Sequence, residues 1–321
     1  MDKILVLHNA ISDHSLMDEL DVLDQADAVE QALDELGYSH SRASFGLNLE
    51  PVRQILEAES PDLVFNLVET IGGKGSLIHL CPSLLEAYHI PYTGSGPWSL
   101  LVTTDKVRTK KILKEKGVAT PGWIIPQDNQ EPVPDQKYIL KPVWEDGSAG
   151  ITDESIIHGK DFNYRQYSRD KKTKEYMLEE FIEGREFNIT MLHGEDSPVV
   201  MPPAEMLYLD FPPGKPKILN YASKWDTGSF EYHNTIRSFE LGEGDRDLVG
   251  KLVQISRECW DIFEMRGYMR VDFRVDGQMQ PYVIEVNANP CLSPDAGFPA
   301  ACAKGGIEYT EMIHWIVKNA L

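Results

Sequence analysis

The segment 267–290, GYMRVDFRVDGQMQPYVIEVNANP, most constrains what this chain can fold into. Apolar and polar residues alternate in both halves, which is the period of a half-buried β-strand. In the second half, Ile284 and Val286 form the apolar side. Asp276 and Gly277 lie between the halves, and this dipeptide is typical of a hairpin turn. We therefore expect two antiparallel strands joined by a short loop.

Pairing across this hairpin predicts a cluster of oxygen atoms on one face. With a loop of about four residues, Asp272 lies opposite Glu285. The same pairing sets Arg270 opposite Asn287. Two opposed carboxylates are destabilising unless a cation bridges them, and Mg²⁺ prefers oxygen ligands. The hairpin therefore predicts a magnesium site made by Asp272, Glu285 and Asn287, whereas a solvated strand face is the alternative for any one of them.

Composition excludes several classes of protein. The formal net charge of −20 argues against binding to a nucleic-acid backbone or an anionic membrane. The chain of 321 residues has no apolar run of about 18 residues, so we expect no transmembrane helix, and its first residues do not resemble a signal peptide. Its cysteines show no CxxC spacing, which predicts neither a disulfide framework nor a zinc site and fits a cytoplasmic protein. They are Cys81, Cys259, Cys291 and Cys302.

Strand-like and helix-like segments alternate at the start of the chain, which predicts an open parallel sheet with helices on both faces. The expected strands are 3–7, 38–44, 63–67 and 90–93, and the expected helices are 28–36, 52–59 and 77–89. Ligands of such sheets bind at the carboxyl ends of the strands. Polar residues expected near a substrate there are Asn9, Asp18, Glu19, Asp21 and Glu69, although each alone is more often a solvated loop residue.

The middle of the chain carries signals for a phosphate site. A strand at 137–142 ends with Lys141 and Pro142, and the small-residue loop 145–151 follows it. Such a loop can bring backbone N–H groups close to phosphate oxygens. A helix is expected at 104–115, and most of its basic side chains should be solvated. The basic residues of this helix are Lys106, Arg108, Lys110, Lys111 and Lys114. Further strands are expected at 175–181, 186–192 and 204–209, and further helices at 248–265 and 307–321.

Several motifs follow one another in a specific order. They are PYTGS at 91–95 with TDK at 104–106, ILKP at 139–142 with GSAG at 147–150, LEEF at 178–181 with GREF at 184–187, YASKW at 221–225, and RVD at 270–272 with IEVNANP at 284–290. On these motifs nearly the whole chain resembles the ATP-grasp superfamily and, within it, the D-alanine–D-alanine ligases.

The resemblance implies an α/β fold, α+β overall, in three domains. Residues 1–97 would form an N-terminal open parallel-sheet domain, 98–184 a central lid domain, and 185–321 a C-terminal antiparallel-sheet domain. ATP would lie between the last two. The implied reaction joins a carboxylate, expected to belong to an amino acid, to an amine through an acyl-phosphate, with release of ADP and phosphate. The implied cofactors are ATP and two Mg²⁺ ions, for which Mn²⁺ can substitute. The implied partners are small amino-acid or amine substrates and a second copy of the chain, paired through the first domain.

The resemblance also implies a role for each site residue. For ATP, these are Lys106, Lys141 and Ser148 at the phosphates, Ile151, Glu179, Phe181, Ile182 and Ile284 around the adenine, and Glu186 at the ribose. Asp272, Glu285 and Asn287 would hold the magnesium ions. Lys224 would approach the γ-phosphate, and Arg270 would stabilise the oxyanion when the amine attacks. For Lys224 and Arg270, an ordinary ion pair with a nearby acid is the alternative.

The chain departs from the D-alanine–D-alanine ligases mainly around the substrate. Glu19 falls in a segment that matches the family pattern loosely, and Glu69 lies where the family has a His-Gly turn. Cys291 and Asp295 follow the hairpin where the family has a glycine and a Ser-Leu pair. These four residues are the candidate substrate contacts. Gly147 and Trp225 also replace a usual serine and a usual tyrosine. The acidic entrance suits a cationic or multi-amine acceptor.

Other functions remain open at this point. A true D-alanine–D-alanine ligase is the alternative within the same class. A non-catalytic ATP-binding or sensing module is an alternative of another class, although such a protein need not keep every metal ligand. A kinase of a small alcohol on the same fold would release ADP without forming an amide.

Overall fold

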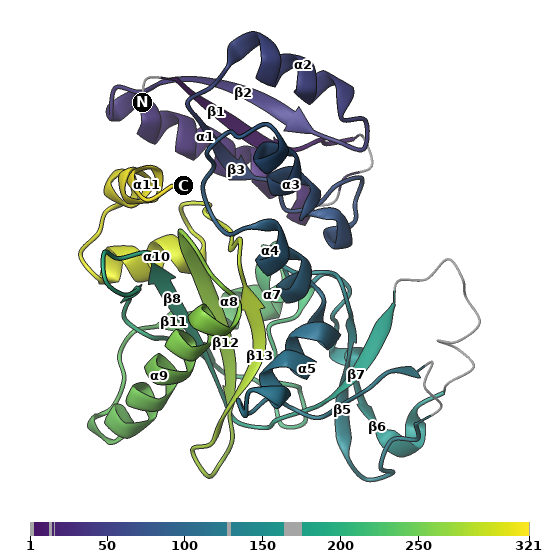
Figure 1. The fold of residues 1–321 in the computed structure, drawn as a ribbon. Helices are drawn as coiled ribbons and strands as arrows, with labels where there is room; N and C mark the ends of the chain where they lie inside the picture. The colour runs from purple at the N-terminus through teal and green to yellow at the C-terminus, as the bar shows by residue number, and fades with distance from the viewer. Residues whose placement is uncertain (1–2, 13–14, 16, 127–129, 164–174, 321) are drawn as a thin grey trace.

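A computed structural model describes residues 3–12, 15, 17–126, 130–163 and 175–320. It contains three β-sheets (Figure 1). A three-stranded sheet lies at the top of the view, a six-stranded sheet below it, and a four-stranded sheet at the lower right. The predicted last helix, 307–321, ends at a residue outside the described part of the chain.

The N-terminal sheet is parallel, as predicted. Its central strand β1 (Lys3–Asn9) pairs with β2 (Ser39–Phe45) and β3 (Leu63–Leu67). Helices cover both faces, which is why the whole apolar run of β1 is buried. On one face lie α1 (Met17–Glu35) and α11 (Tyr309–Lys318), and on the other lie α2 (Glu50–Glu59) and α3 (Leu80–Ala87). The last helix of the chain therefore completes the core of the first sheet.

Three expected elements differ from the structure. The fourth strand at 90–93 is a single bridge between Val64 and Tyr92. The first helix, expected at 28–36, begins at Met17, and Asp18 and Glu19 in its first turn interact favourably with the helix dipole. The helix expected at 104–115 is two helices, α4 (Pro97–Thr104) and α5 (Lys106–Glu115). Asp105 separates them because its carboxylate caps the first N–H groups of α5.

The six-stranded sheet supplies one wall of the site. Its strand order is β11 (Thr235–Ser238), β10 (Ala204–Tyr208), β8 (Arg185–Leu192), β12 (Tyr268–Val275) and β13 (Pro281–Asn287), with β9 (Val199–Val200) paired to β8. One face packs against α4, α5 and α9 (Arg246–Ile262). The other face carries the charged residues of β8, β12 and β13 and lines a cavity.

The hairpin β12–β13 has the predicted register, with Asp272 opposite Glu285 and Arg270 opposite Asn287. The register shifts immediately beyond Asp272, because Val283 rather than Ile284 pairs with Phe273. This β-bulge sets the side chain of Ile284 in the lining of the cavity. The strict alternation expected from the sequence, with Ile284 on the apolar side, was wrong at this residue.

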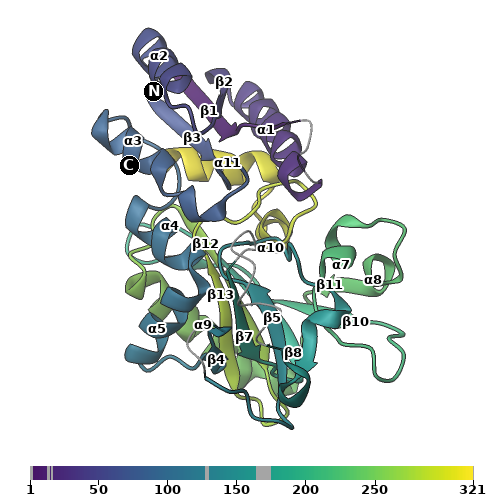
Figure 2. The same ribbon diagram turned by 90° about the vertical axis from the view of Figure 1, so that its right-hand side faces the viewer.

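A four-stranded sheet, short helices and 3₁₀ turns complete the fold (Figure 2). The four-stranded antiparallel sheet has the order β4 (Trp123–Ile124), β7 (Tyr176–Glu180), β5 (Lys137–Pro142) and β6 (Ile156–His158). Short helices are α7 (Tyr221–Trp225), α8 (Phe230–Asn234) and α10 (Gly297–Lys304). The 3₁₀ turns are η1 (Gly75–Leu77), η3 (Asp153–Ser155), η4 (Gly159–Asp161) and η5 (Glu243–Asp245).

Gly267, just before β12, approaches the backbone of Gly94. Its φ is +68°, and an added Cβ would lie 3.0 Å from Cα and N of Gly94. We expect Gly267→Ala to lower the free energy of unfolding by about 1–3 kcal/mol, because it adds backbone strain and a backbone contact. Urea denaturation measures this change.

Gly277→Ala in the turn is the matched control, because no atom lies within 4 Å of its Cβ position. It should change the free energy of unfolding by less than about 0.5 kcal/mol. Equal effects of the two substitutions would contradict the close-approach explanation.

Candidate active site

Every predicted site residue lines one cavity of about 490 Å³. Its walls come from the four-stranded sheet, the six-stranded sheet, and the segments that follow β1, β3 and β13. The predicted residues that line it are Glu19, Glu69, Lys106, Lys141, Ser148, Ile151, Glu179, Phe181, Ile182, Glu186, Lys224, Arg270, Asp272, Ile284, Glu285, Asn287, Cys291 and Asp295. Segments far apart in sequence thus meet at one site.

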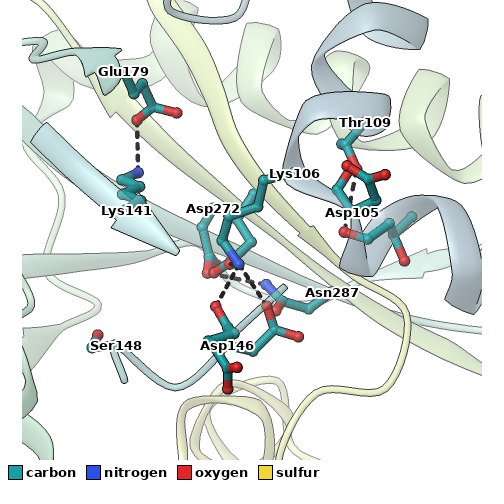
Figure 3. A network of polar contacts seen from close by, with 12 residues as sticks. Asp105, Lys106, Thr109, Lys141, Asp146, Ser148, Glu179, Asp272 and Asn287 are labelled. Atoms are coloured by element: carbon teal, nitrogen blue, oxygen red, sulfur yellow. Dashed lines mark hydrogen bonds and ion pairs between the residues drawn. The ribbon is translucent and has the colours of Figure 1, made fainter. Parts of the chain in front are cut away.

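Asp272 is the centre of a polar network on the hairpin face. Its Oδ1 accepts hydrogen bonds from Asn188 Nδ2 at 2.7 Å and Arg270 Nε at 2.8 Å. Its Oδ2 accepts from Arg270 Nη2 at 2.8 Å and Asn287 Nδ2 at 3.1 Å. Because the amide nitrogen of Asn287 faces Asp272, its amide oxygen is left for another partner. Figure 3 shows the Asn287 amide beside Asp272.

Glu285 is held as an ionised carboxylate. Burial raises its pKa, but the ammonium groups of Lys106, Lys141 and Lys224 outweigh burial and lower the pKa to about 2. The Oε1 of Glu285 lies 3.0 Å from Lys106 Nζ. An ionised glutamate beside an aspartate and an amide oxygen fits the oxygen ligands of a hard cation such as Mg²⁺.

Lys106 and Lys141 reach the cavity from different elements (Figure 3). Lys106, the first residue of α5, donates to the backbone oxygen of Glu145 at 2.6 Å and to Asp146 Oδ1 at 2.9 Å. Lys141 of β5 donates to Glu179 Oε1 at 2.6 Å. Two buried ammonium groups therefore flank the same cavity, as a polyphosphate site requires.

Most basic side chains of this helix were expected to be solvated, and Lys110 is an exception. It is only 1% exposed, and its Nζ lies 2.6 Å from Glu179 Oε2. Lys110 follows Lys106 by four residues on α5, so both side chains project from the same side of the helix. Lys106 is buried as well, whereas Arg108, Lys111 and Lys114 are exposed as expected.

Glu179 is paired on both carboxylate oxygens, to Lys110 and Lys141. Burial acts to raise its pKa, but the two lysines outweigh burial and the pKa is lowered. Its predicted contact with the adenine amino group stays a prediction. The ion pairs show that Glu179 also orients Lys141.

The flap at 145–151 is closed onto α7. Ser148 Oγ donates to the Leu219 carbonyl at 2.8 Å, and the Tyr221 N–H donates to the Ile151 carbonyl at 3.0 Å. The Trp225 indole N–H donates to the Gly147 carbonyl at 3.0 Å. Gly147 and Trp225, which replace a usual serine and a usual tyrosine of the family, are therefore in direct contact with each other. Gly147 has a φ of +66°, a backbone conformation that favours glycine. Its carbonyl oxygen accepts the hydrogen bond from the Trp225 indole.

Lys224 and Arg270 differ in their partners. Arg270 has the ion pair with Asp272 that was its alternative role, although it also lines the cavity. Lys224 has no ion pair with any residue of the described chain. Burial lowers its pKa, and the nearby charge of Arg270 lowers it further. An unpaired ammonium at this position is available to an anionic ligand.

Sequence reasoning missed Gln25, which contacts Glu69 at the substrate end of the cavity. Gln25 donates to Glu69 at 2.8 Å, and its Oε1 accepts from the Leu292 N–H at 2.9 Å. The sequence does contain a signal for Gln25, because it is the one polar residue among the buried residues of α1. Asp21 accepts from Ser293 Oγ at 2.9 Å and from Cys291 Sγ at 3.1 Å.

Comparison with known proteins identifies the family. Residues 137–318 match the family model described as the D-ala D-ala ligase C-terminus. A D-alanine–D-alanine ligase of Aquifex aeolicus is 31% identical over 296 residues, which cover 90% of this chain and 92% of that protein. One of Carboxydothermus hydrogenoformans is 28% identical, covering 92% of each. This chain belongs to the D-alanine–D-alanine ligase family.

The solved structures agree with this membership at the level of the fold. A D-alanine–D-alanine ligase of Bacillus anthracis, complexed with ATP, superposes with a TM-score of 0.74 at 21% identity, covering 99% of this chain and 97% of that chain. The D-alanine–D-alanine ligase family comprises ATP-dependent ligases, so the predicted superfamily, fold class and ATP-dependent carboxylate–amine ligase activity are confirmed. The three domain boundaries and the role of each residue stay predictions. No helix in the described residues has the length and apolarity that crossing a bilayer requires.

Removal of one carboxylate tests the predicted metal ligands of this family member. We expect Glu285→Gln to lower ADP formation by at least about 100-fold, since losing even an outer-shell partner costs about 10- to 100-fold. The same variant should need more Mg²⁺ for half-maximal rate. Steady-state rates across a Mg²⁺ titration measure both effects. Glu258→Gln, an exposed change on α9, should leave both unchanged, and near-normal turnover of Glu285→Gln would disprove the assignment.

Glu69 predicts a pH dependence of stability. Burial raises its pKa from 4.5 to about 8, and Asp21, Asp146 and Asp18 add to the rise. Between these values the unfolded state loses the proton first, so this group makes the folded protein less stable as pH rises. We expect Glu69→Gln to flatten the fall in unfolding free energy from about pH 4.5 to 8, as measured by urea denaturation at several pH values. The exposed change Glu311→Gln should keep the wild-type slope.

Proposed function

We propose that this chain is a Mg²⁺-dependent ligase that joins the carboxylate of an amino acid to an amine, through an acyl-phosphate, with release of ADP and phosphate. The observation that carries the proposal is the convergence of three lysines on the Asp272–Glu285 face within one cavity. Lys106, Lys141 and Lys224 supply positive charge for the phosphates of ATP. They come from α5, β5 and α7.

The nucleoside end of ATP would lie between the two antiparallel sheets. Ile151 and Ile284 both line the cavity and offer apolar surfaces to an adenine ring. The backbone of Phe181 and Ile182 would read the edge of the ring. Glu186 suits the ribose hydroxyls, because Arg274 and Tyr208 hold its carboxylate at 3.0 and 2.7 Å.

Asp272, Glu285 and Asn287 would hold magnesium ions, or manganese in their place. When bound, the ions would neutralise phosphate charge during transfer. The remaining chemistry needs no protein nucleophile. A carboxylate oxygen forms a bond to the γ-phosphorus as the bond to ADP breaks. The amine nitrogen then attacks the carbonyl carbon, a proton leaves the nitrogen, and phosphate departs.

Arg270 would stabilise the negative oxygen that forms in the second step, because its guanidinium is fixed by Asp272 beside the metal residues. The acids Glu19, Glu69 and Asp295, together with Cys291, line the other end of the cavity. They suit the ammonium group of an amino-acid substrate or a cationic acceptor. We place the ligase in the cytoplasm, as a homodimer through the first domain.

D-alanyl-D-alanine is the second candidate product, supported by the names of the relatives. Against it, Asp295 adds a negative charge where the second carboxylate of that dipeptide would lie. Whether the product is D-alanyl-D-alanine or another amide therefore depends on which acceptor the enzyme binds.

An ADP-release screen tests the proposed reaction. Pairs of L- and D-amino acids and polyamines are incubated with ATP and Mg²⁺, and products are identified by mass spectrometry. We expect ADP release that requires both substrates and yields an amide. Lys141→Met, which removes a proposed phosphate contact, measures the background. ATP binding without turnover would favour a sensing module, and a phosphorylated product without an amide would favour a kinase.

A further inference from the structure

The loop between β13 and α10, residues 288–296, is held from several sides, and we call it the substrate loop. It connects the hairpin β12–β13 to α10 and lines the substrate end of the cavity. Asn289 Nδ2 donates to the Val68 carbonyl at 3.1 Å, and its Oδ1 accepts from the Tyr268 hydroxyl at 2.9 Å. The Leu292 carbonyl accepts from the Tyr309 hydroxyl at 3.0 Å. The placement of this loop therefore depends on segments that are distant in the sequence.

Asp21 of α1 holds two side chains of the substrate loop. Both of its carboxylate oxygens accept from Ser293 Oγ at 2.9 Å, and its Oδ2 also accepts from Cys291 Sγ at 3.1 Å. Ser293 is only 2% exposed, so its buried hydroxyl depends on Asp21 for an acceptor. Burial raises the pKa of Asp21, whereas the hydrogen bonds from Cys291 and Ser293 act to lower it. These hydrogen bonds therefore favour the ionised carboxylate and join α1 to the loop.

Gln25, one turn further along α1, makes a second connection to the same loop. It is only 1% exposed, and its Oε1 accepts from the Leu292 N–H at 2.9 Å. A backbone N–H can only donate, so this contact fixes the orientation of the Gln25 amide. Its Nε2 donates to Glu69 Oε1 at 2.8 Å and to Asp21 Oδ2 at 3.3 Å. One amide therefore connects α1, the substrate loop and the segment that follows β3.

The polar atoms of Asp21 and Gln25 are already engaged with the protein. Each carboxylate oxygen of Asp21 has a donor, and both ends of the Gln25 amide have partners. The two residues are four apart on α1, so their side chains project from the same side of the helix. Together they act on the substrate loop and on Glu69, which both line the cavity.

We propose that Asp21 and Gln25 are positioning residues for the ligase reaction. This inference rests on the proposed function, because it concerns how that same site is assembled. Glu69 and the substrate loop belong to different segments, and these two side chains attach both of them to α1. The helix thus sets the separation between Glu69 and the loop, and with it the geometry in which the two substrates meet. A displacement of about 1 Å at a reacting centre can slow a reaction about 100-fold.

A double-mutant cycle tests whether Asp21 acts through the substrate loop. The readout is ADP release per folded enzyme, with the substrate pair that the screen identifies. We expect Asp21→Ala to lower kcat by about 10- to 100-fold while the KM for ATP stays unchanged. Asp21→Asn keeps an oxygen for Ser293 and should recover part of the loss. Asp24→Ala, an exposed change on the same helix, should have no effect.

The decisive comparison is made in a variant that carries both Cys291→Ala and Ser293→Ala. There, Asp21→Ala should lower kcat by less than about threefold, because its partners in the loop are already gone. Losses that multiply instead would show that Asp21 acts on a substrate directly, and they would overturn the inference.

Hydrogen exchange separates this inference from the proposed reaction. Amide exchange of the substrate loop, followed by mass spectrometry, requires no turnover. We expect Gln25→Met to speed the exchange of the Leu292 amide by about 10-fold, because this N–H loses its acceptor, and to lower kcat as Asp21→Ala does. Asp24→Ala should match the wild type in both measurements.

Faster exchange in Gln25→Met supports the connection between α1 and the loop even if no amide product is ever found. Unchanged exchange overturns the inference even if the ligase reaction is established. Faster exchange with an unchanged kcat overturns it as well, because the loop would then be attached to α1 without any consequence for the reaction.

Discussion

The ion pair between Lys106 and Glu285 is the interaction on which the site depends. It joins the start of α5 to the strand β13 across the cavity, at 3.0 Å. Opposite charges at this separation interact strongly when water is largely excluded. The pair holds Glu285 ionised, and the ionised Glu285 in turn balances the positive charge that a polyphosphate site needs. Each residue also has other support, since Lys106 pairs with Asp146 as well and Lys141 and Lys224 lie near Glu285.

A second, buried set of ion pairs supports the pair between Lys106 and Glu285. Lys110 and Lys141 share Glu179 between α5, β5 and β7, and all three side chains are buried. Such a buried network contributes less to net stability than to a unique arrangement, because desolvation offsets much of the attraction. Its effect here is geometric. It fixes the four-stranded sheet and α5 relative to each other, and so sets the distance between Lys141 and the hairpin.

Much of the site could be predicted because it repeats local rules. The hairpin register followed from strand alternation and turn length, and the order of the motifs led to the family. The errors occurred where a residue's environment comes from distant segments. Lys110 looked like part of a solvated helix face, and only the approach of β7 supplies the carboxylate that buries it. The bulge at Ile284 was equally invisible, since it depends on how β13 fits beside β12.

The sequence by itself determined the strand periods, the pairing of Asp272 with Glu285, and the set of residues suited to phosphates and a hard cation. Those features depend on backbone period and side-chain chemistry, which are local. Only the tertiary structure decided that α11 returns to complete the first sheet, that Gly147 and Trp225 form one contact, and that Asp21 and Gln25 of α1 hold the loop between β13 and α10. The reason is that the partners of a side chain depend on which distant segments pack beside it.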